Sequence, residues 1–156
     1  MARKSGLTPL WNKSDIKKLF GKVGERVDMH IVTMLQQAGE EFVSFARLQA
    51  PENSFYDHTQ NLRNSIGFVI VRDGKIIGEN FKEQGGGKEG VVAAKQLCSD
   101  LARTYTSGYV LIGVAGMKYA AYVEAIESKD VISRAASLTE DHIKKMGQLL
   151  FNRLGL

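Results

Sequence analysis

Cysteine and proline are nearly absent from this sequence, which holds one cysteine, Cys98, and two prolines. A single cysteine excludes an internal disulfide framework and any zinc site built from cysteines, so a reducing compartment is the simplest expectation. With so little proline, the chain must make its turns with its 16 glycines.

Long apolar runs are also missing. No run approaches the ~20 residues that a membrane-spanning helix needs, so we expect no membrane partner. The basic start at Arg3 and Lys4 lacks the apolar segment of a signal peptide. The 156 residues are 44% hydrophobic and 24% charged, which is typical of one soluble globular domain. The net charge of +4 permits a nucleic-acid neighbour without requiring one.

Residues that would indicate catalysis do not occur in useful patterns. His58 follows Asp57, but a metal site needs three or four converging ligands, and no second histidine stands at ligand spacing. The run Gly85-Gly86-Gly87-Lys88 lacks the Ser or Thr that a phosphate-binding loop places after its lysine. We therefore predict no catalytic, metal or cofactor-binding residues, and a protein that is not an enzyme.

Hydrophobic periodicity predicts a long helix in the first third of the chain. Residues 1–13 form a basic arm that contains Trp11, and a single α+β domain follows over residues 14–156. Ser14 and Asp15 are the expected helix cap. Gly21 and Gly24 predict a kink or break, after which one amphipathic helix covers about residues 25–49. Its apolar face is expected to pack on a sheet through these residues: Val27, Ile31, Leu35, Phe42 and Phe45.

Strand patterns follow the long helix. Residues 66–71 and 75–78 flank Asp73-Gly74, a strong signal for a β-hairpin. The glycine-rich stretch over residues 81–90 predicts a mobile loop, and a helix then ends near Thr104. A buried strand over residues 109–112 turns at Gly113 and Gly116 into a helical pattern. A last helix after Asp130 completes the fold, in which the long N-terminal helix packs on a small, mostly antiparallel sheet.

Three short motifs in this order resemble a known family. They are ARLQAP at residues 46–51, TQNLRNSI at residues 59–66 and YAAYVE at residues 119–124. Together they are similar to the tail-completion, or head–tail joining (neck), proteins of tailed bacteriophages, in the form carried by phages and prophages of Bacteroides-type hosts. The resemblance covers about residues 27–150. Gln60 stands where the family pattern has glycine, as does Ile126.

The resemblance implies a structural virion protein, assembled in the bacterial host cytoplasm. Such a protein forms a six-fold or twelve-fold homo-oligomeric ring at the head–tail junction or the top of the tail. Its partners would be other connector, portal or tail-tube proteins, and non-specifically the passing DNA. The alternative is a small basic DNA-binding module, which the basic residues near the N terminus and Arg63, Arg72 and Lys75 near the hairpin would support.

The candidate functional residues are contacts between subunits or with partners. Tyr119 and Tyr122 can each bury a ring and still hydrogen-bond at an interface edge. Glu124 is expected to meet an arginine, either Arg47 or Arg63, which the family-like motifs supply. The remaining candidate contacts are Trp11 in the arm and the loop glycines Gly85, Gly86 and Gly87.

Overall fold

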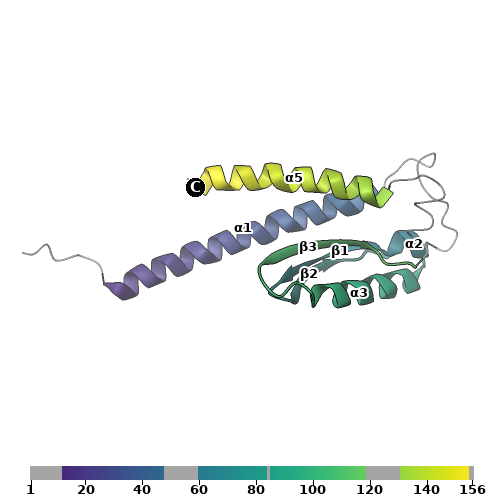
Figure 1. Ribbon diagram of the computed structural model, residues 1–156, viewed down its shortest axis with the longest axis horizontal. Coiled ribbons are helices and arrows are strands. Elements are labelled where there is room, and N and C mark those ends of the chain that lie inside the picture. Colours follow the sequence, from purple (N-terminus) through teal and green to yellow (C-terminus); the bar gives the residue numbers. More distant parts are fainter. Residues whose placement is uncertain (1–11, 48–59, 84, 119–130, 155–156) are drawn as a thin grey trace, which may run out of the picture.

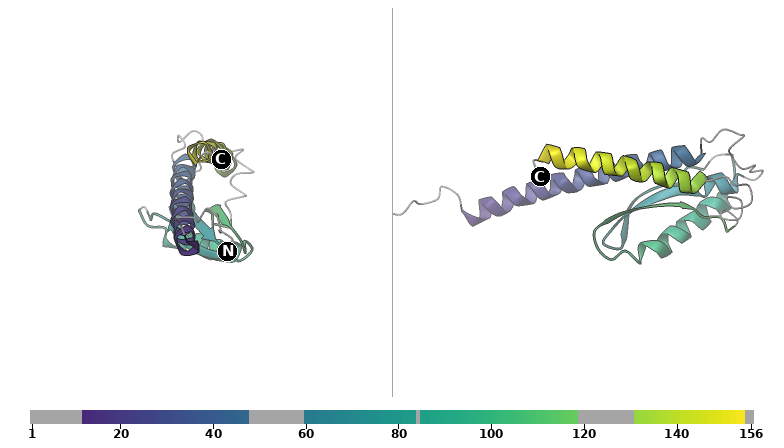
Figure 2. Two further views of the ribbon diagram at one scale, coloured as in Figure 1. Left: turned by 90° about the vertical axis from the view of Figure 1, so that its left-hand side faces the viewer. Right: turned by 45° about the horizontal axis from the view of Figure 1, so that its top comes forward.

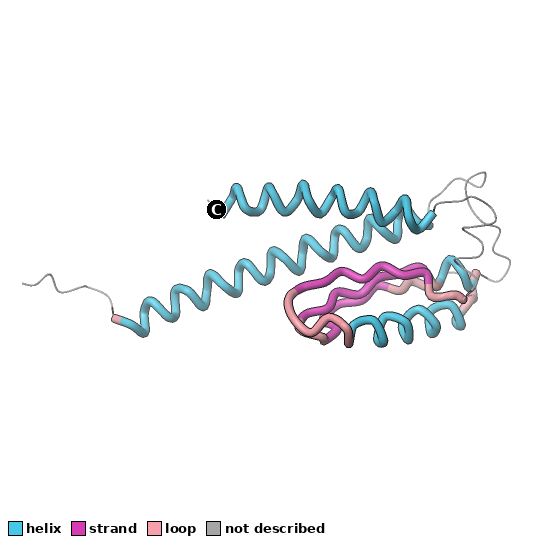
Figure 3. Tube along the Cα trace, in the orientation of Figure 1, coloured by secondary structure: helices cyan, strands magenta, loops and turns pink. Residues whose placement is uncertain are grey.

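The computed structural model describes residues 12–47, 60–83, 85–118 and 131–154. Here a three-stranded sheet has helix α1 on one face, with α5 against it, and helix α3 on the other (Figures 1 and 3). The elements are α1 (Lys13–Arg47), α2 (Asn61–Asn64), β1 (Ile66–Arg72), β2 (Lys75–Asn80), α3 (Lys88–Ala102), β3 (Tyr109–Ala115) and α5 (Val131–Leu154). The predicted α+β class is confirmed.

Helix α1 is one continuous helix of 35 residues, so the break predicted at Gly21 and Gly24 is wrong. Nothing lies within 4 Å of a side chain added at either glycine, and no competing contact draws the chain out of the helix. The cost is therefore only helix propensity, about 1 kcal/mol for each glycine. The expected cap is also corrected: Asn12 caps the helix, because its Oδ1 accepts a hydrogen bond from the Asp15 backbone N at 2.9 Å.

The sheet has the order β2-β1-β3, and β1 pairs antiparallel with both neighbours. The hairpin predicted at Asp73-Gly74 is present. Both residues have positive φ, 50° and 78°, the signature of a type I′ turn. A register shift between Ile70 and Val71 places a bulge in β2. Strands β2 and β3 form the two edges of the sheet.

The face of the sheet toward α1 is packed by two aromatic–glycine contacts. The Phe68 ring lies against Gly39 of α1, where an added Cβ would stand 2.4 Å from a ring carbon. The Phe42 ring of α1 lies against Gly113 of β3, where an added Cβ would stand 2.8 Å from a ring carbon. Phe42 and Phe68 are buried. Two missing side chains therefore let the helix backbone approach the sheet closely.

The predicted apolar face of the long helix is confirmed in its second half. Leu35 and Phe42 are buried, and Ile31 packs against the same core. Val27 is only half-buried. Phe45 is 40% exposed, so its predicted packing on the sheet is wrong. It lies at the margin of the buried row, which consists of Leu35, Ala38, Gly39, Phe42, Val43 and Ala46.

The opposite face of the sheet packs on α3 through small side chains. Ala94, Cys98 and Ala102 stand four residues apart on one side of the helix and are buried against Val69 and Val71. Burial, with a smaller effect of the Glu79 charge, raises the pKa of the Cys98 thiol to about 11. Cys98 is thus a neutral core residue, as its place on an apolar helix face predicts.

Helix α5 lies along the second half of α1 and runs back toward the N-terminal half of that helix (Figure 1). His142 Nδ1 lies 2.9 Å from Glu41 Oε2 and links the two helices. Ala135 and Thr139 are buried at the contact. The last predicted helix is therefore confirmed, and it covers only part of α1.

We predict that Gly39→Ala destabilises the protein by about 1–3 kcal/mol, the usual range for overpacking a core. The new methyl group would overlap the Phe68 ring, which is fully buried and has no free direction in which to move. Urea unfolding followed by circular dichroism measures the loss as a lower transition midpoint.

The matched control is Gly24→Ala, the same substitution in the same helix. Nothing lies within 4 Å of the new methyl group, and alanine favours the helix by up to about 1 kcal/mol. Equal shifts for the two variants would show that the close approach at Gly39 is not a packing constraint.

Candidate assembly surface

Four of the predicted contact residues lie outside the described residues: Trp11, Tyr119, Tyr122 and Glu124. Their roles stay predictions. The other candidates, Arg47, Arg63 and the three loop glycines, are described, and all of them lie near one end of the sheet.

Arg47 connects the end of α1 to two other parts of the chain. Its Nη2 donates to the Ile66 carbonyl at 2.6 Å, and its Nη1 donates to the Lys82 carbonyl at 3.0 Å. Arg63 Nη1 in turn donates to the Arg47 carbonyl at 3.3 Å. Burial lowers the pKa of the Arg47 guanidinium, but an arginine keeps its charge at neutral pH. The structure thus brings the two predicted arginines together.

The Nε of Arg47 is buried and has no hydrogen-bond partner among the residues that the structure describes. A buried donor of this kind costs about 1–3 kcal/mol if it stays unpaired. The guanidinium otherwise binds only backbone carbonyls, so this group carries a positive charge with no carboxylate partner in the described part of the chain.

The loop glycines pack by their backbone against α2. Asn64 Nδ2 donates to the Gly86 carbonyl, and the Gly90 backbone N lies 3.3 Å from Asn61 Oδ1. A Cβ at Gly87 would stand 2.7 Å from the Gln60 carbonyl, so no side chain fits there. Gly85, Gly86 and Gly87 all have positive φ. These contacts are made within the chain; the loop's predicted mobility and its contact with a partner stay predictions.

Gln60 adopts the left-handed conformation, with φ 60° and ψ 5°. Glycine adopts this conformation without the steric cost that a Cβ adds. This is the position where the family pattern has glycine, so the backbone matches the pattern although the residue does not. The following short helix then places Leu62, Asn64 and Ser65 in the buried interior.

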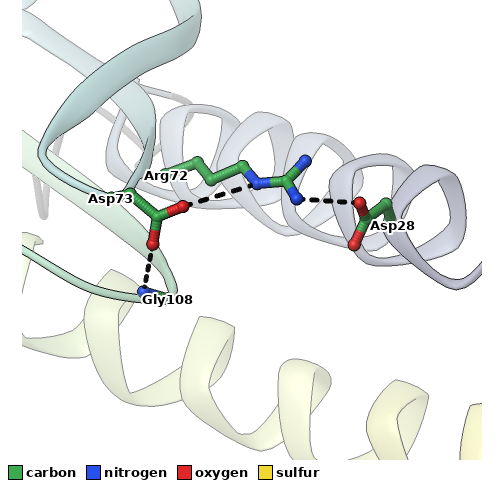
Figure 4. Close-up of polar contacts among 4 residues, drawn as sticks. All are labelled: Asp28, Arg72, Asp73 and Gly108. Atoms are coloured by element: carbon green, nitrogen blue, oxygen red, sulfur yellow. Dashed lines mark hydrogen bonds and ion pairs between the residues drawn. The ribbon is translucent and has the colours of Figure 1, made fainter. Parts of the chain in front are cut away.

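The tip of the hairpin is held against α1 by charged groups that the sequence analysis did not identify (Figure 4). Arg72 Nη2 lies 2.9 Å from Asp28 Oδ2 of α1, and its guanidinium stands 5.0 Å from the centre of the Tyr109 ring. Asp73 Oδ1 accepts a hydrogen bond from the Gly108 backbone N at 2.8 Å. Burial, and next the Asp28 carboxylate, raise the pKa of Tyr109. Arg72 is thus engaged within the chain.

The first half of α1 extends beyond the sheet and beyond the end of α5 (Figures 1 and 2). Residues 12–26 are all exposed. Their apolar side chains nevertheless recur at helical spacing on one side of the helix. This α1 stripe consists of Ile16, Leu19, Phe20 and Val23, which are 37%, 62%, 71% and 49% exposed.

A second apolar surface, which no described residue fills, lies between α5 and β3. This β3 groove has a volume of about 410 Å³. It is lined by Phe42, Leu111, Gly113, Ile132, Ala136, Thr139, Glu140, Ile143 and Lys144. A further groove of about 290 Å³ separates the end of α5 from the middle of α1, near His30 and Met34. Both grooves are mainly apolar.

Groups suited to metal chemistry do not gather in the described part of the chain, where no three His, Cys, Asp or Glu side chains lie close enough to hold an ion. Among the described helices none is both long and apolar enough to cross a bilayer. What the described surface offers is apolar stripes and grooves, which suit packing against other proteins.

With the α+β fold and its apolar surfaces described, comparison with protein families gives one match. The family model HK97-gp10_like, described as "Bacteriophage HK97-gp10, putative tail-component", matches residues 14–125. The chain belongs to this family of phage tail components. The expected resemblance to phage tail and head–tail proteins is confirmed, and the match does not distinguish a Bacteroides-type version. No curated protein and no solved structure gives a significant match.

We predict that Arg47→Met destabilises the subunit by about 2–3 kcal/mol, because it removes two charge-assisted hydrogen bonds and leaves the buried Ile66 carbonyl without its donor. Methionine keeps the apolar stem, so lost packing contributes little. The midpoint of urea unfolding measures the effect.

Lys82→Ala is the control for Arg47→Met. Arg47 binds the backbone carbonyl of Lys82, and the Lys82 side chain is exposed, so stability should change by less than about 0.5 kcal/mol. An Arg47→Met variant as stable as Lys82→Ala would mean that the Arg47 hydrogen bonds do not hold the fold together.

Proposed function

We propose that this chain is a structural subunit of a tailed-phage virion that forms a ring at the head–tail junction or the top of the tail, around the DNA channel. The observation that carries the proposal is the family match over residues 14–125, which makes the chain a phage tail component. The ring is our extension of that finding. It is supported by the α1 stripe and the β3 groove, because two different apolar surfaces on one chain permit a head-to-tail contact that closes on itself.

Electron microscopy and mass photometry of the purified full-length chain test the ring. We expect closed rings of one size, six-fold or twelve-fold, whose population rises with protein concentration. The chain would join portal, connector or tail-tube proteins in the virion, so co-expression with such a protein should increase the yield of rings. A chain that stays monomeric in both preparations at high concentration would contradict the proposal.

We further propose that Tyr119, Tyr122 and Glu124 act in structure and assembly, with the Glu124 carboxylate pairing with Arg47 or Arg63. Support comes from Arg47, whose buried Nε has no partner among the described residues and whose guanidinium binds only carbonyls there. A buried charge pair is costly to break from one side, about 3–5 kcal/mol, whereas an exposed pair matters little.

The variant Glu124→Gln separates the possibilities. If the carboxylate pairs with Arg47 inside the subunit, Glu124→Gln lowers the melting temperature, and adding Arg47→Met costs less than it does alone. If Glu124 meets an arginine of a neighbour, the subunit keeps its melting temperature but loses its rings. Wild-type rings and an unchanged melting temperature would mean that the carboxylate is merely solvated, and the proposed pairing would be wrong.

A small basic DNA-binding module is the alternative function. Two of the three residues near the hairpin that favoured it are engaged within the chain: Arg72 pairs with Asp28, and Arg63 donates to the Arg47 carbonyl. The basic residues near the N terminus also favoured it, and those in the first half of α1 are exposed: Lys13, Lys17, Lys18, Lys22 and Arg26. Strong, steeply salt-dependent DNA binding by the isolated subunit would favour the alternative over a ring that DNA passes through.

A further inference from the structure

We propose that the α1 stripe of one copy seats in the β3 groove of the next copy. This inference rests on the proposed function and specifies the contact between neighbouring subunits of the ring. It explains the α1 stripe and the β3 groove, the two apolar surfaces described above, by a single contact. Four observations support it.

The first observation is that the stripe and the groove match in pattern and in length. Ile16, Leu19, Phe20 and Val23 stand at i, i+3, i+4 and i+7, the spacing by which an amphipathic helix enters an apolar groove. The stripe covers about 10 Å of helix at 1.5 Å per residue. The groove follows α5 from Ile132 to Ile143, about 16 Å on the same scale, so it can hold the whole stripe.

The second observation is the contrast between the two edges of the sheet. Edge strands usually carry charges, bulges or proline, which prevent unwanted pairing. Strand β2 follows this rule, since it has Lys75 and Glu79 and a bulge opposite Ile70 and Val71. Strand β3, with the sequence YVLIGVA, has no charged residue and keeps an unbroken register with β1. The β3 side, which borders the groove, therefore has the character of a surface that is covered in the assembled protein.

The third observation is that the stripe continues an existing interface with α5. Residues seven apart lie on one side of a helix, and Phe20, Val27, Met34 and Glu41 form such a row. The last two already face α5 in the same chain, since Met34 lines a groove with the end of α5 and Glu41 pairs with His142. The N-terminal end of the row thus has the same orientation on α1 as the part that packs on α5. An α5 surface in a second copy is the natural place for it.

The fourth observation is the distribution of charge. Pairing two stripes with each other would bring the basic flanks of two copies together, namely Lys17, Lys18, Lys22 and Arg26 of each. Only Asp15 and Glu25 offset this charge in the exposed half of α1. The β3 groove contains one charge of each sign, Glu140 and Lys144, which already pair at 2.7 Å. The groove therefore accepts the stripe without adding a concentrated positive charge.

Site-specific disulfide cross-linking between two variants of the full-length chain, each with one added cysteine, tests the contact. One variant is Phe20→Cys, in the middle of the stripe, and the other is Ala136→Cys, in the groove; both positions are exposed, so neither change should disturb folding. The native Cys98 is fully buried and serves as the unreactive background. Under mild oxidation we expect the mixture to form a covalent dimer, and each variant alone to form at least 10-fold less.

The matched control replaces Phe20→Cys by Lys22→Cys, which is exposed on the same part of α1 but lies off the stripe. Its mixture with Ala136→Cys should form at least 10-fold less dimer. Equal cross-linking of both mixtures would overturn the inference, because it would reflect random collision. Efficient dimer formation by Phe20→Cys alone would also overturn it, since the stripe would then pair with itself.

Microscopy of the same samples separates this inference from the proposed ring. If rings form and the stripe–groove mixture gives no cross-link, the contact is wrong although the ring stands. If the cross-link forms specifically but the chains grow into open filaments, the contact stands and the closed ring is wrong. If neither rings nor cross-links form at high concentration, both proposals fail.

Discussion

The close approach of α1 to the sheet is the constraint on which the rest of the structure depends. The Phe68 ring packs against Gly39, and the Phe42 ring packs against Gly113. Each ring occupies the space that a side chain at the facing position would fill. The two contacts come from opposite partners, one ring from the sheet and one from the helix. They fix both the height of α1 above the sheet and its position along the strands. A slide of the helix by one residue would bring a Cβ onto an aromatic ring.

Fixing α1 in this register also determines how far it projects. A helix of 35 residues is about 52 Å long at 1.5 Å per residue, whereas the seven residues of β1 cover about 23 Å at 3.3 Å per residue. Since the C-terminal half is committed to the core, the N-terminal half must extend beyond it. Isolated helices shorter than about 12–15 residues are marginal in water, and this half also contains two glycines. The N-terminal half of α1 therefore stays helical because it continues from the C-terminal half, which is packed in the core. Burial of its apolar side would stabilise this half further.

The sequence predicted the elements well wherever local pattern and tertiary packing agree. The type I′ hairpin at Asp73-Gly74, helix α3 and the last helix follow from periodicity and turn chemistry alone. The strand over residues 109–112 was also predicted, but its turn at Gly113 was wrong, because β3 continues through this glycine to Ala115. The predicted break at Gly21 and Gly24 was wrong because the low helix propensity of glycine only raises the free energy of the helix. The chain leaves the helix only if another conformation has a lower free energy. The prediction for Phe45 was wrong because hydrophobic periodicity does not show how wide the buried face of a helix is. The position of the sheet determines which residues at the margin of that face are covered.

The candidate site was harder to predict, because its contacts join parts of the chain far apart in sequence. Arg47 and Arg63 were predicted as alternative partners of Glu124, and that role stays a prediction, although the structure places the two arginines next to each other. The carbonyls that they bind belong to Ile66, Lys82 and Arg47. Every residue has a backbone carbonyl, so a sequence does not show which of them accepts such a hydrogen bond. The Asp28–Arg72 pair, 44 residues apart, was missed for a similar reason. The apolar spacing of the α1 stripe can be seen in the sequence, but its exposure cannot, because a sequence does not show how far a helix extends beyond the sheet on which it packs.

The motif residues that the structure describes, which belong to the ARLQAP and TQNLRNSI stretches, lie at a different place from the proposed subunit contact. Arg47 and Asn64 close one end of the sheet with side-chain hydrogen bonds to backbone carbonyls, which need particular residue types, and Gln60 forms a left-handed turn beside them. The α1 stripe and the β3 groove need only apolar side chains of fitting size on a helix and beside a strand. A motif of the first kind can be recognised in a sequence, because few residues can replace an arginine that binds two carbonyls. An apolar interface leaves only a pattern of spacing, so the resemblance identifies the fold, while the arrangement of the assembly has to be inferred from the surface.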